Sequence, residues 1–334
     1  MATLPAGQLT LLDYAKRLDP KGTVATVAEL LTQLNDILED AVFVEGNLPT
    51  GHRVTIRTGL PTVYFRQINA GVPTSKSTTA QVDEPAAMLE ARSHIDAKLL
   101  QLNGNSASFR LSEDSAFIEA MNQQQANTMF YGNLAVDAKT YTGLATRYSA
   151  ISGAGNAQNI VDAGGTGSVN TSIYFVGWGQ NSVFCTFPKG SKAGINYRDL
   201  GEESVADANG NFYQAVRSLY QWDNGLVVKD WRYAVRIANI DTTNLVAESS
   251  AADLIKVMVK AVARIPSFNN IRPVFYANRT IYEMLMIQAL NKSTNALSVQ
   301  DALSQFGTTT KTLHFMGFPI RMCDQLLNTE ARVV

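Results

Sequence analysis

The sequence predicts an α+β protein in which helical and β-rich segments follow one another along the chain. Three observations lead to this fold class. A long helical pattern covers residues 112–132, strand patterns fill residues 171–241, and helices with short strands return in residues 245–328. With 334 residues and 46% hydrophobic content, the chain is long enough to bury a sizeable core.

The balance of charges argues against several classes of function. The chain has 28 Lys and Arg against 29 Asp and Glu, and it lacks a basic run, so it is not expected to read a nucleic-acid sequence. Only 17% of the residues are charged, which indicates that much of the surface faces other protein. No apolar run approaches the roughly 20 residues of a membrane span, and the first residues do not form a signal peptide pattern. We therefore expect no membrane partner and a protein that is made and used in a cytoplasm.

The first part of the chain, residues 1–47, is expected to form an arm. Residues 11–15 offer a short apolar stripe, and leucine and isoleucine recur with a helical period in residues 26–39. Both predicted helices lack an obvious core of their own. They would need a surface to lie on, such as another subunit.

Residues 48–86 change in character and predict a long β-loop. Residues 52–56 and 63–68 are typical of strands, residues 71–79 are rich in Ser and Thr, and residues 82–85 return the chain. A loop of this length without a core is usually functional or disordered. A hairpin that lies across a neighbouring molecule would satisfy both its backbone and its few apolar side chains.

A strand in residues 88–102 is expected to lead into the long helix at 112–132. Ser112 is a candidate N-cap, and Gly132 is expected to end the helix in the left-handed conformation. One face of the helix is apolar, and the other is rich in Asn and Gln rather than charge. An ordinary core helix is the plainer interpretation. A helix packed over a sheet that also touches a neighbour is the sharper one.

The segment 171–241 predicts β-structure. Strands are expected at 173–178 and 183–187, and an Asp-Asn-Gly turn at 223–225 predicts a hairpin between 212–222 and 226–237. Apolar and polar residues alternate in the last of these strands. This alternation predicts one buried and one polar face.

The remaining part of the chain returns to helices with short strands. Ser250 is expected to cap a helix, residues 273–277 predict a buried strand, and Asn278 turns the chain into another helix. A further helix is expected at 298–307. Two short strands around a Met-Gly-Phe-Pro corner are expected within residues 312–323.

No catalytic constellation is visible, and the sequence predicts no catalytic residue, no cofactor and no metal site. His52, His94 and His314 lie in three different regions with no motif around them. The Gly-rich segment 149–170, expected to be a linker or mobile loop, lacks the Gly-Lys-Ser/Thr ending of a phosphate-binding loop. An unrelated α+β enzyme with this segment as a lid remains an alternative.

The order of these pieces resembles that of the major capsid proteins of tailed double-stranded DNA bacteriophages, which have the HK97-like shell fold. Residues 174–179 and 188–190 look like segments of short-tailed phage shell proteins, and residues 274–279 and 315–320 look like the strand and Gly-X-Pro corner of the family. The resemblance implies an N-terminal arm at 1–47, an E-loop at 48–86, a peripheral domain at 87–241 with its spine helix at 112–132, and an axial domain at 242–334.

The resemblance also implies a function. The chain would self-assemble through pentamers and hexamers into an icosahedral virion shell around a double-stranded DNA genome, in the cytoplasm of a host bacterium. The implied partners are cement or decoration, scaffolding and portal proteins, with non-specific contact to the packaged DNA. The Lys and Asn that cross-link some relatives have no match here, so a non-covalent shell is expected. In the family, the β-rich segment follows the Gly-X-Pro corner, whereas here it precedes it, which implies rearranged connections.

Six residues are candidates for contacts between subunits. They lie in the loop, on the helix and after a strand: Phe65, Ile68, Asn122, Gln124, Gln125 and Lys189. For Lys189 an ordinary solvated loop is the plainer interpretation. A shell of the same fold that encloses an enzyme, as in encapsulin-like nanocompartments, is the main functional alternative.

Overall fold

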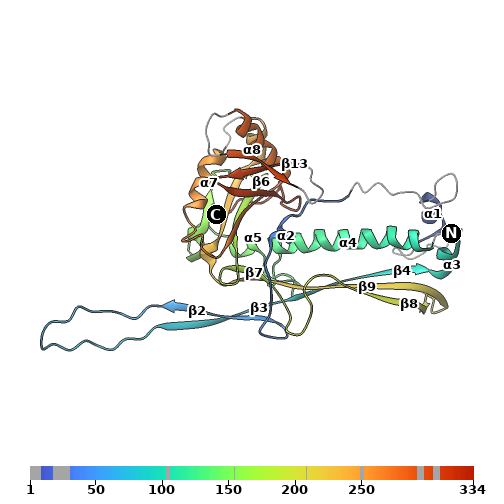
Figure 1. The fold of residues 1–334 in the computed structure, drawn as a ribbon, viewed down its shortest axis with the longest axis horizontal. Helices are drawn as coiled ribbons and strands as arrows, with labels where there is room; N and C mark the ends of the chain where they lie inside the picture. Colours follow the sequence, from blue (N-terminus) through green and yellow to red (C-terminus); the bar gives the residue numbers. More distant parts are fainter. Residues whose placement is uncertain are drawn as a thin grey trace.

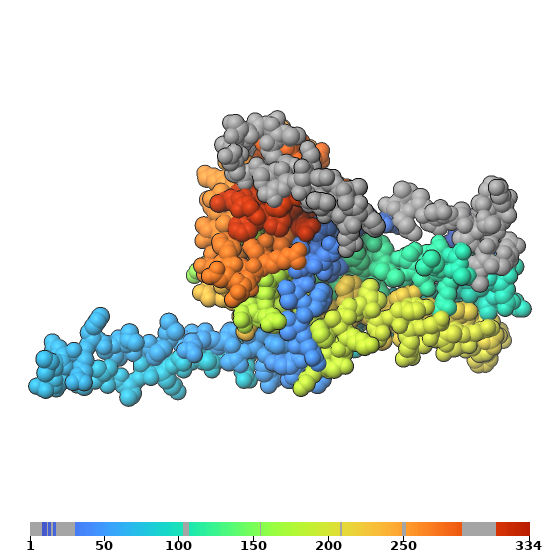
Figure 2. Space-filling model, in the orientation of Figure 1, coloured from blue at the N-terminus to red at the C-terminus, as the bar shows by residue number. Residues whose placement is uncertain are grey.

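The computed structural model describes residues 9–17, 31–102, 106–153, 155–207, 209–248, 252–291, 297–303 and 309–334. Figure 1 shows three regions: a compact body, a long layer of one helix over strands, and a thin hairpin that projects away from both. The helix layer and the hairpin extend in opposite directions from beneath the body. The molecule is therefore elongated, and the space-filling view of Figure 2 shows the hairpin as an isolated projection.

The long layer consists of the spine helix α4 (Ser106–Tyr131) and a sheet beneath it. Strand β9 (Phe212–Val228) pairs antiparallel with β4 (Ala87–Asp96) on one side and with β8 (Asn196–Ala206) on the other. Phe117 of the helix stacks on Tyr220 of β9, with ring centroids 6.2 Å apart. At a rise of 1.5 Å per residue, the helix is about 39 Å long.

The predicted spine helix is confirmed and ends at Tyr131, next to Gly132 as expected, but its predicted start and the predicted conformation of Gly132 are wrong. The helix begins at Ser106, so Ser112 lies inside it and is not the N-cap. Gly132 is not left-handed. A Cβ at Gly132 would lie 2.3 Å from the carbonyl oxygen of Tyr141 and 2.6 Å from that of Thr128. Glycine is therefore needed because the chain passes close to the helix end.

The strand predicted at 88–102 is a strand followed by a short helix, α3 (Ala97–Gln101). Asp96 caps this helix, since its side chain accepts a hydrogen bond from the backbone N–H of Lys98 at 2.7 Å. The expected turn at residues 103 and 104 lies outside the described residues.

The arm differs from the prediction. Helix α1 (Leu11–Lys16) lies on its own chain, because the Tyr14 hydroxyl donates to the carbonyl of Leu102 at 2.8 Å. Of the helix expected at 26–39, only α2 (Ile37–Asp40) is helical among the described residues 31–39. Residues 31–36 are not helical because their backbone bonds to the body instead: the Asp36 N–H, for example, donates to the carbonyl of Met322.

The projecting hairpin consists of β2 (Gly51–Gly59) and β3 (Thr78–Pro85), which pair antiparallel with each other. The strand predicted at 52–56 is confirmed. The strand predicted at 63–68 is wrong, since residues 60–77 contain no regular strand. No partner strand of the described chain lies beside them, so local β-propensity alone does not form a strand.

The hairpin predicted around 223–225 is wrong, because β9 runs through these residues as one strand of 17 residues. Asn224 pairs with Ala87 of β4, and Gly225 pairs with Thr186 of β7 (Val183–Phe187). A Cβ at Gly225 would lie 2.5 Å from the carbonyl oxygen of Pro85. Glycine is needed at this position because two backbones cross closely where the pairing partner of β9 changes from β4 to β7.

The compact body is built on a sheet that continues from β9 and β7 through further strands. Its strands besides β7 are β1 (Phe43–Glu45), β5 (Ile160–Asp162), β6 (Asn170–Trp178), β10 (Ala234–Asp241), β11 (Arg272–Ala277), β12 (Leu297–Leu303), β13 (Thr309–Phe315) and β14 (Phe318–Met322). Its helical segments are α5 (Leu144–Arg147), η2 (Gly155–Asn159), η3 (Trp231–Tyr233), α6 (Thr242–Val246), α7 (Leu254–Val262) and α8 (Arg279–Asn291). The path of the sheet is β12-β13-β14-β11-β6-β7-β9-β4.

Both faces of the body sheet are buried. Phe175 of β6 stacks on Phe275 of β11 with centroids 4.0 Å apart, in a cluster that includes α7 and α8. The preceding residue, Tyr174, contacts Phe130 of the spine helix on the opposite face. Because successive strand residues point to opposite faces, two cores lie on either side of one sheet.

Several predictions for the body are wrong for the same reason, that tertiary packing overrides the local pattern. β10 is buried on both faces rather than polar on one. The helix expected at 298–307 is strand β12 over its described part, which pairs antiparallel with β13. The segment 149–170 is not only a linker, since it holds η2 and the buried start of β5.

Other predictions for the body are confirmed. The strand at 273–277 is β11, and Asn278 caps α8, since its side-chain oxygen accepts from the Ile281 N–H at 2.9 Å. The helix predicted after Ser250 is α7, but the prediction of Ser250 as its cap is wrong, since the N-cap is Asp253, whose side chain accepts from the Lys256 N–H. Ser250 and Gly307 lie outside the described residues.

Candidate inter-subunit surfaces

The residues predicted to contact other subunits lie in separate regions of the structure. Phe65 and Ile68 lie between β2 and β3, residues 122–125 lie in α4, and Lys189 follows β7. They do not form one site within a single chain. A shared role would require neighbouring molecules to bring them together.

The outer part of the hairpin, residues 60–77, is the E-loop tip. Phe65 and Ile68 are 108% and 91% exposed. Further exposed apolar side chains of the tip are Leu60, Val63, Tyr64 and Val72. Apolar groups gathered on one exposed segment mark an interaction site rather than a folding core.

The amide-rich face of the spine helix mostly binds its own chain. Gln125 is 3% exposed and donates from Nε2 to the Tyr141 hydroxyl at 2.8 Å. Gln123 donates to the carbonyl of Leu31 at 2.7 Å. Gln125 is therefore buried within its own chain, which leaves it little surface for the predicted contact with another subunit.

Two other residues of this helix face are less buried than Gln125. Gln124 is exposed and bonds only weakly to Thr128, with a donor–acceptor distance of 3.4 Å. Asn122 is half-buried, and among the described residues its Oδ1 has no hydrogen-bond partner. Gln124 lines a hollow beside the first residues of β4, where Met88 is also exposed.

Lys189 lies beside the base of the hairpin. Its side chain is exposed, and its backbone N–H donates to the carbonyl of Leu48 at 3.2 Å. The next residue, Gly190, donates from its N–H to Glu45 at 2.9 Å. The strand end at β7 is thus fixed against the residues that lead into the E-loop.

The sequence reading missed the ion pair at the base of the hairpin. Glu84 of β3 accepts two hydrogen bonds from Arg147 of α5, at 2.7 and 2.6 Å. The same guanidinium donates to the carbonyl of Leu226 at 3.0 Å. Nothing in the local sequence joins residues so far apart, so this contact has no sequence signal.

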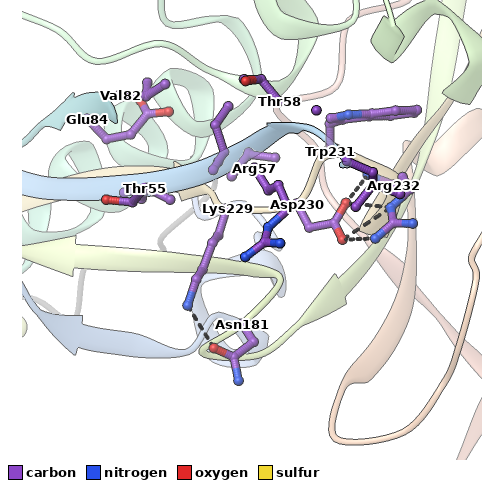
Figure 3. A pocket seen from close by; sticks show the side chains of 15 residues that line it. Thr55, Arg57, Thr58, Val82, Glu84, Asn181, Lys229, Asp230, Trp231 and Arg232 are labelled. Carbon is purple, nitrogen blue, oxygen red and sulfur yellow. Dashed lines mark hydrogen bonds and ion pairs between the residues drawn. The ribbon is translucent and has the colours of Figure 1, made fainter. Parts of the chain in front are cut away.

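A groove of about 720 Å³ runs between the hairpin and the body. Figure 3 shows Thr55 and Arg57 of β2 on one side and residues 229–232 on the other. On the body side, Lys229 donates a hydrogen bond to the side-chain oxygen of Asn181 at 2.8 Å, and Asp230 forms an ion pair with Arg232 at 2.7 Å.

The edge of β2 that faces away from β3 is partly occupied by a side chain. Asn47 accepts from the Arg53 N–H at 2.7 Å and donates to the Arg53 carbonyl at 2.8 Å. A side-chain amide here reproduces the pairing of a neighbouring strand. The covered start of this edge limits where another strand could pair with it.

The described residues contain no group of His, Cys, Asp and Glu that could hold a metal ion, and none of their helices has the length and hydrophobicity of a membrane span. His94 bonds to the Tyr213 hydroxyl at 2.8 Å, and the ring of His52 packs edge-on against Phe184. These histidines have separate structural contacts.

Comparison with known proteins identifies the relatives of this chain. The family model for major capsid protein GP7 matches residues 19–334. A chain in the near-atomic-resolution structure of bacteriophage Epsilon15 is 34% identical, with a TM-score of 0.78, over 100% of this chain and 99% of that chain.

More distant solved structures include two capsids. The capsid of bacteriophage JBD30 is 9% identical over 89% of this chain and 92% of that chain, with a TM-score of 0.48. The capsid of the native GTA particle is 11% identical over 67% of this chain and 96% of that chain, also with a TM-score of 0.48. No curated protein matches.

The fold and the family match define a phage capsid protein with the HK97-like fold. The chain belongs to the family of major capsid protein GP7. It is a major capsid protein that self-assembles into the icosahedral shell of a bacteriophage, and its place is the capsid of the virion. The class predicted from the sequence is confirmed.

Proposed function

We propose that the E-loop is the clamp by which each subunit holds its neighbours in the shell. The observation that carries this proposal is the exposure of Phe65 and Ile68 on a hairpin that projects away from every core of its own chain. Burying each side chain fully against a neighbour would contribute about 1.5–3 kcal/mol. Each shell repeats this contact in every subunit, so weak contacts add up.

Gln124, Asn122 and Lys189 are proposed as secondary contacts. Gln124 is exposed on the spine helix, Asn122 is half-buried there with an Oδ1 that has no partner among the described residues, and Lys189 is exposed beside the base of the loop. A neighbour's loop laid along the helix layer would meet these polar groups. Hydrogen bonds to these polar groups would determine the register of the neighbour's loop and would add little to its affinity.

We also propose a revision of the domain boundaries. Among the described residues, 87–143 and 196–228 form the peripheral layer, and 144–187 with 231–334 form the axial body. The support is that β6 pairs with β11 and packs with α7 and α8 in one cluster, although β6 precedes residue 242. In this proposal the arm at 1–47 and the E-loop at 48–86 keep the bounds predicted from the sequence, with β1 of the arm paired to β7 of the body.

The partners of the shell are proposals from the family resemblance. We propose assembly as pentamers and hexamers in the host cytoplasm, with scaffolding, portal and cement or decoration proteins. A formal net charge of −1 supports an inner wall that touches packaged DNA without binding it tightly. We propose a purely structural, non-covalent role, and the family match favours it over a cargo-loaded nanocompartment or an enzyme.

The experiment that tests the clamp is assembly of the variant Phe65→Asp/Ile68→Asp. We expect a folded subunit that fails to form particles in negative-stain images, because two charges replace the apolar contact. Gln67→Asp is the matched control, since it adds a charge to the same exposed segment without removing an apolar side chain. Normal particles from the double variant would refute the clamp.

A further inference from the structure

One guanidinium joins the base of the E-loop to two other parts of the chain. Arg147 binds Glu84 through both terminal nitrogens, and the two side chains are only 17% and 9% exposed. It also donates to the carbonyl of Leu226 in β9 at 3.0 Å and to that of Thr142 at 3.2 Å. A paired, hydrogen-bonded and mostly buried arginine of this kind holds its partners in one geometry.

The same short helix holds a second network on its other side. Arg236 of β10 donates to the carbonyls of Tyr148 and Ala145, at 2.8 and 3.2 Å. Arg236 also pairs with Glu330 at 2.9 Å, and Glu330 accepts from the hydroxyl of Tyr131 at 2.5 Å. Tyr131 is the last residue of the spine helix, so α5 lies between the E-loop and the end of that helix.

Close backbone packing adds to the ion pair at this base. A Cβ at Gly51, where φ is +151°, would lie 2.1 Å from the carbonyl oxygen of Glu84. The crossing at Gly225 is similarly close to Pro85. The hairpin therefore has little room to pivot where it joins the body.

We propose that α5 is a shared anchor that fixes the direction of the E-loop stem, β2 and β3, relative to the spine helix and the body. The stem, the helix end and the body turn as one unit in the shell, and the tip at 60–77 adapts to each neighbour. This inference deepens the proposed clamp, because a clamp of fixed direction determines where the neighbour sits.

The first test is hydrogen exchange on the unassembled protein with Glu84→Gln. We expect at least about tenfold faster exchange both in residues 80–86 and in residues 144–148, because the loss of one contact loosens the shared anchor. Asp83→Asn is the matched control. It breaks an Arg–carboxylate pair on the same hairpin, with Arg53 at 2.5 Å, but both side chains are about half-exposed and do not reach the body.

The control should change exchange only within the hairpin. An effect of Glu84→Gln that is also confined to the hairpin would overturn the anchor. The milder variant Glu84→Asp keeps the charge and shortens the side chain, and the same pattern of responses is expected from it.

The second test is a double-mutant cycle between two residues without a direct contact. Glu84→Gln and Tyr131→Phe should shift the unfolding midpoint non-additively, since both act on α5, whereas Asp83→Asn and Tyr131→Phe should be additive. Additive shifts in the first cycle would overturn the anchor. The clamp is tested separately, because Phe65→Asp/Ile68→Asp changes assembly without touching α5.

Discussion

Arg236 and Glu330 form an ion pair at 2.9 Å inside the subunit, and only 6% and 5% of their side chains are exposed. The pair joins β10 to the segment after β14 and, through Tyr131, to the end of the spine helix. Burial, with the neighbouring Tyr174 and Glu330, raises the pKa of Tyr131, so its hydroxyl remains a donor to Glu330.

Replacing Glu330 with Gln should lower the free energy of unfolding by about 3 kcal/mol, because Arg236 keeps its buried charge without a counter-ion. Chemical denaturation of the unassembled subunit measures this change. Asp83→Asn, at an exposed pair, should cost far less. Equal losses in the two variants would show that burial of the Arg236 pair is unimportant.

Gly225→Ala should destabilise the subunit by about 1–3 kcal/mol, as expected for overpacking. The new methyl group would lie 2.5 Å from the carbonyl oxygen of Pro85, on backbone that cannot move aside easily. Gly71→Ala is the control, since nothing lies within 4 Å of its Cβ position. Thermal unfolding of both variants checks this, and an unchanged midpoint for Gly225→Ala would contradict the close crossing.

The sequence predicted the order and class of most elements but not the long-range contacts. The spine helix and the strand at 273–277 were predictable because their apolar residues repeat over a full element. The Asp-Asn-Gly turn at 223–225 failed because β4 and β7, distant in sequence, pair with both ends of the same strand. The helix expected at 298–307 failed because β13 pairs with its described part.

The candidate contacts could be predicted only in a segment without a core of its own, because the apolar side chains of such a segment have to be exposed. Phe65 and Ile68 lie in a long loop predicted to have little to bury, and the structure shows them exposed. Gln125 was assigned to an outer surface, but Tyr141 provides a buried partner for it. The pair of Glu84 and Arg147 could not be predicted, because no local pattern links a strand end to a helix that follows much later.

Acid should weaken the subunit through His94. Burial, followed by the nearby Arg217, lowers the pKa of His94 below its ordinary value of 6.5. The unfolded chain then binds the proton more tightly than the folded chain does. The contribution of neutral His94 to the free energy of unfolding is therefore complete above about pH 6.5, and it is lost as the pH falls through the lower pKa of the folded state. Unfolding midpoints from about pH 7.5 to about pH 5 should fall less steeply for His94→Gln than for the wild type.

His52→Gln is a second variant in this series, because burial also lowers the pKa of His52. Each single variant should remove part of the pH dependence, and the double variant should remove more. An unchanged slope in all three would contradict the assignment.

Cryo-EM of the assembled shell at side-chain resolution tests the central claim most directly. The measurement is the exposed area of Phe65 and Ile68 within the particle. We predict that both side chains are buried against a neighbouring subunit in every symmetry-distinct copy. E-loop tips that stay in solvent, in particles that are otherwise complete, would contradict the account.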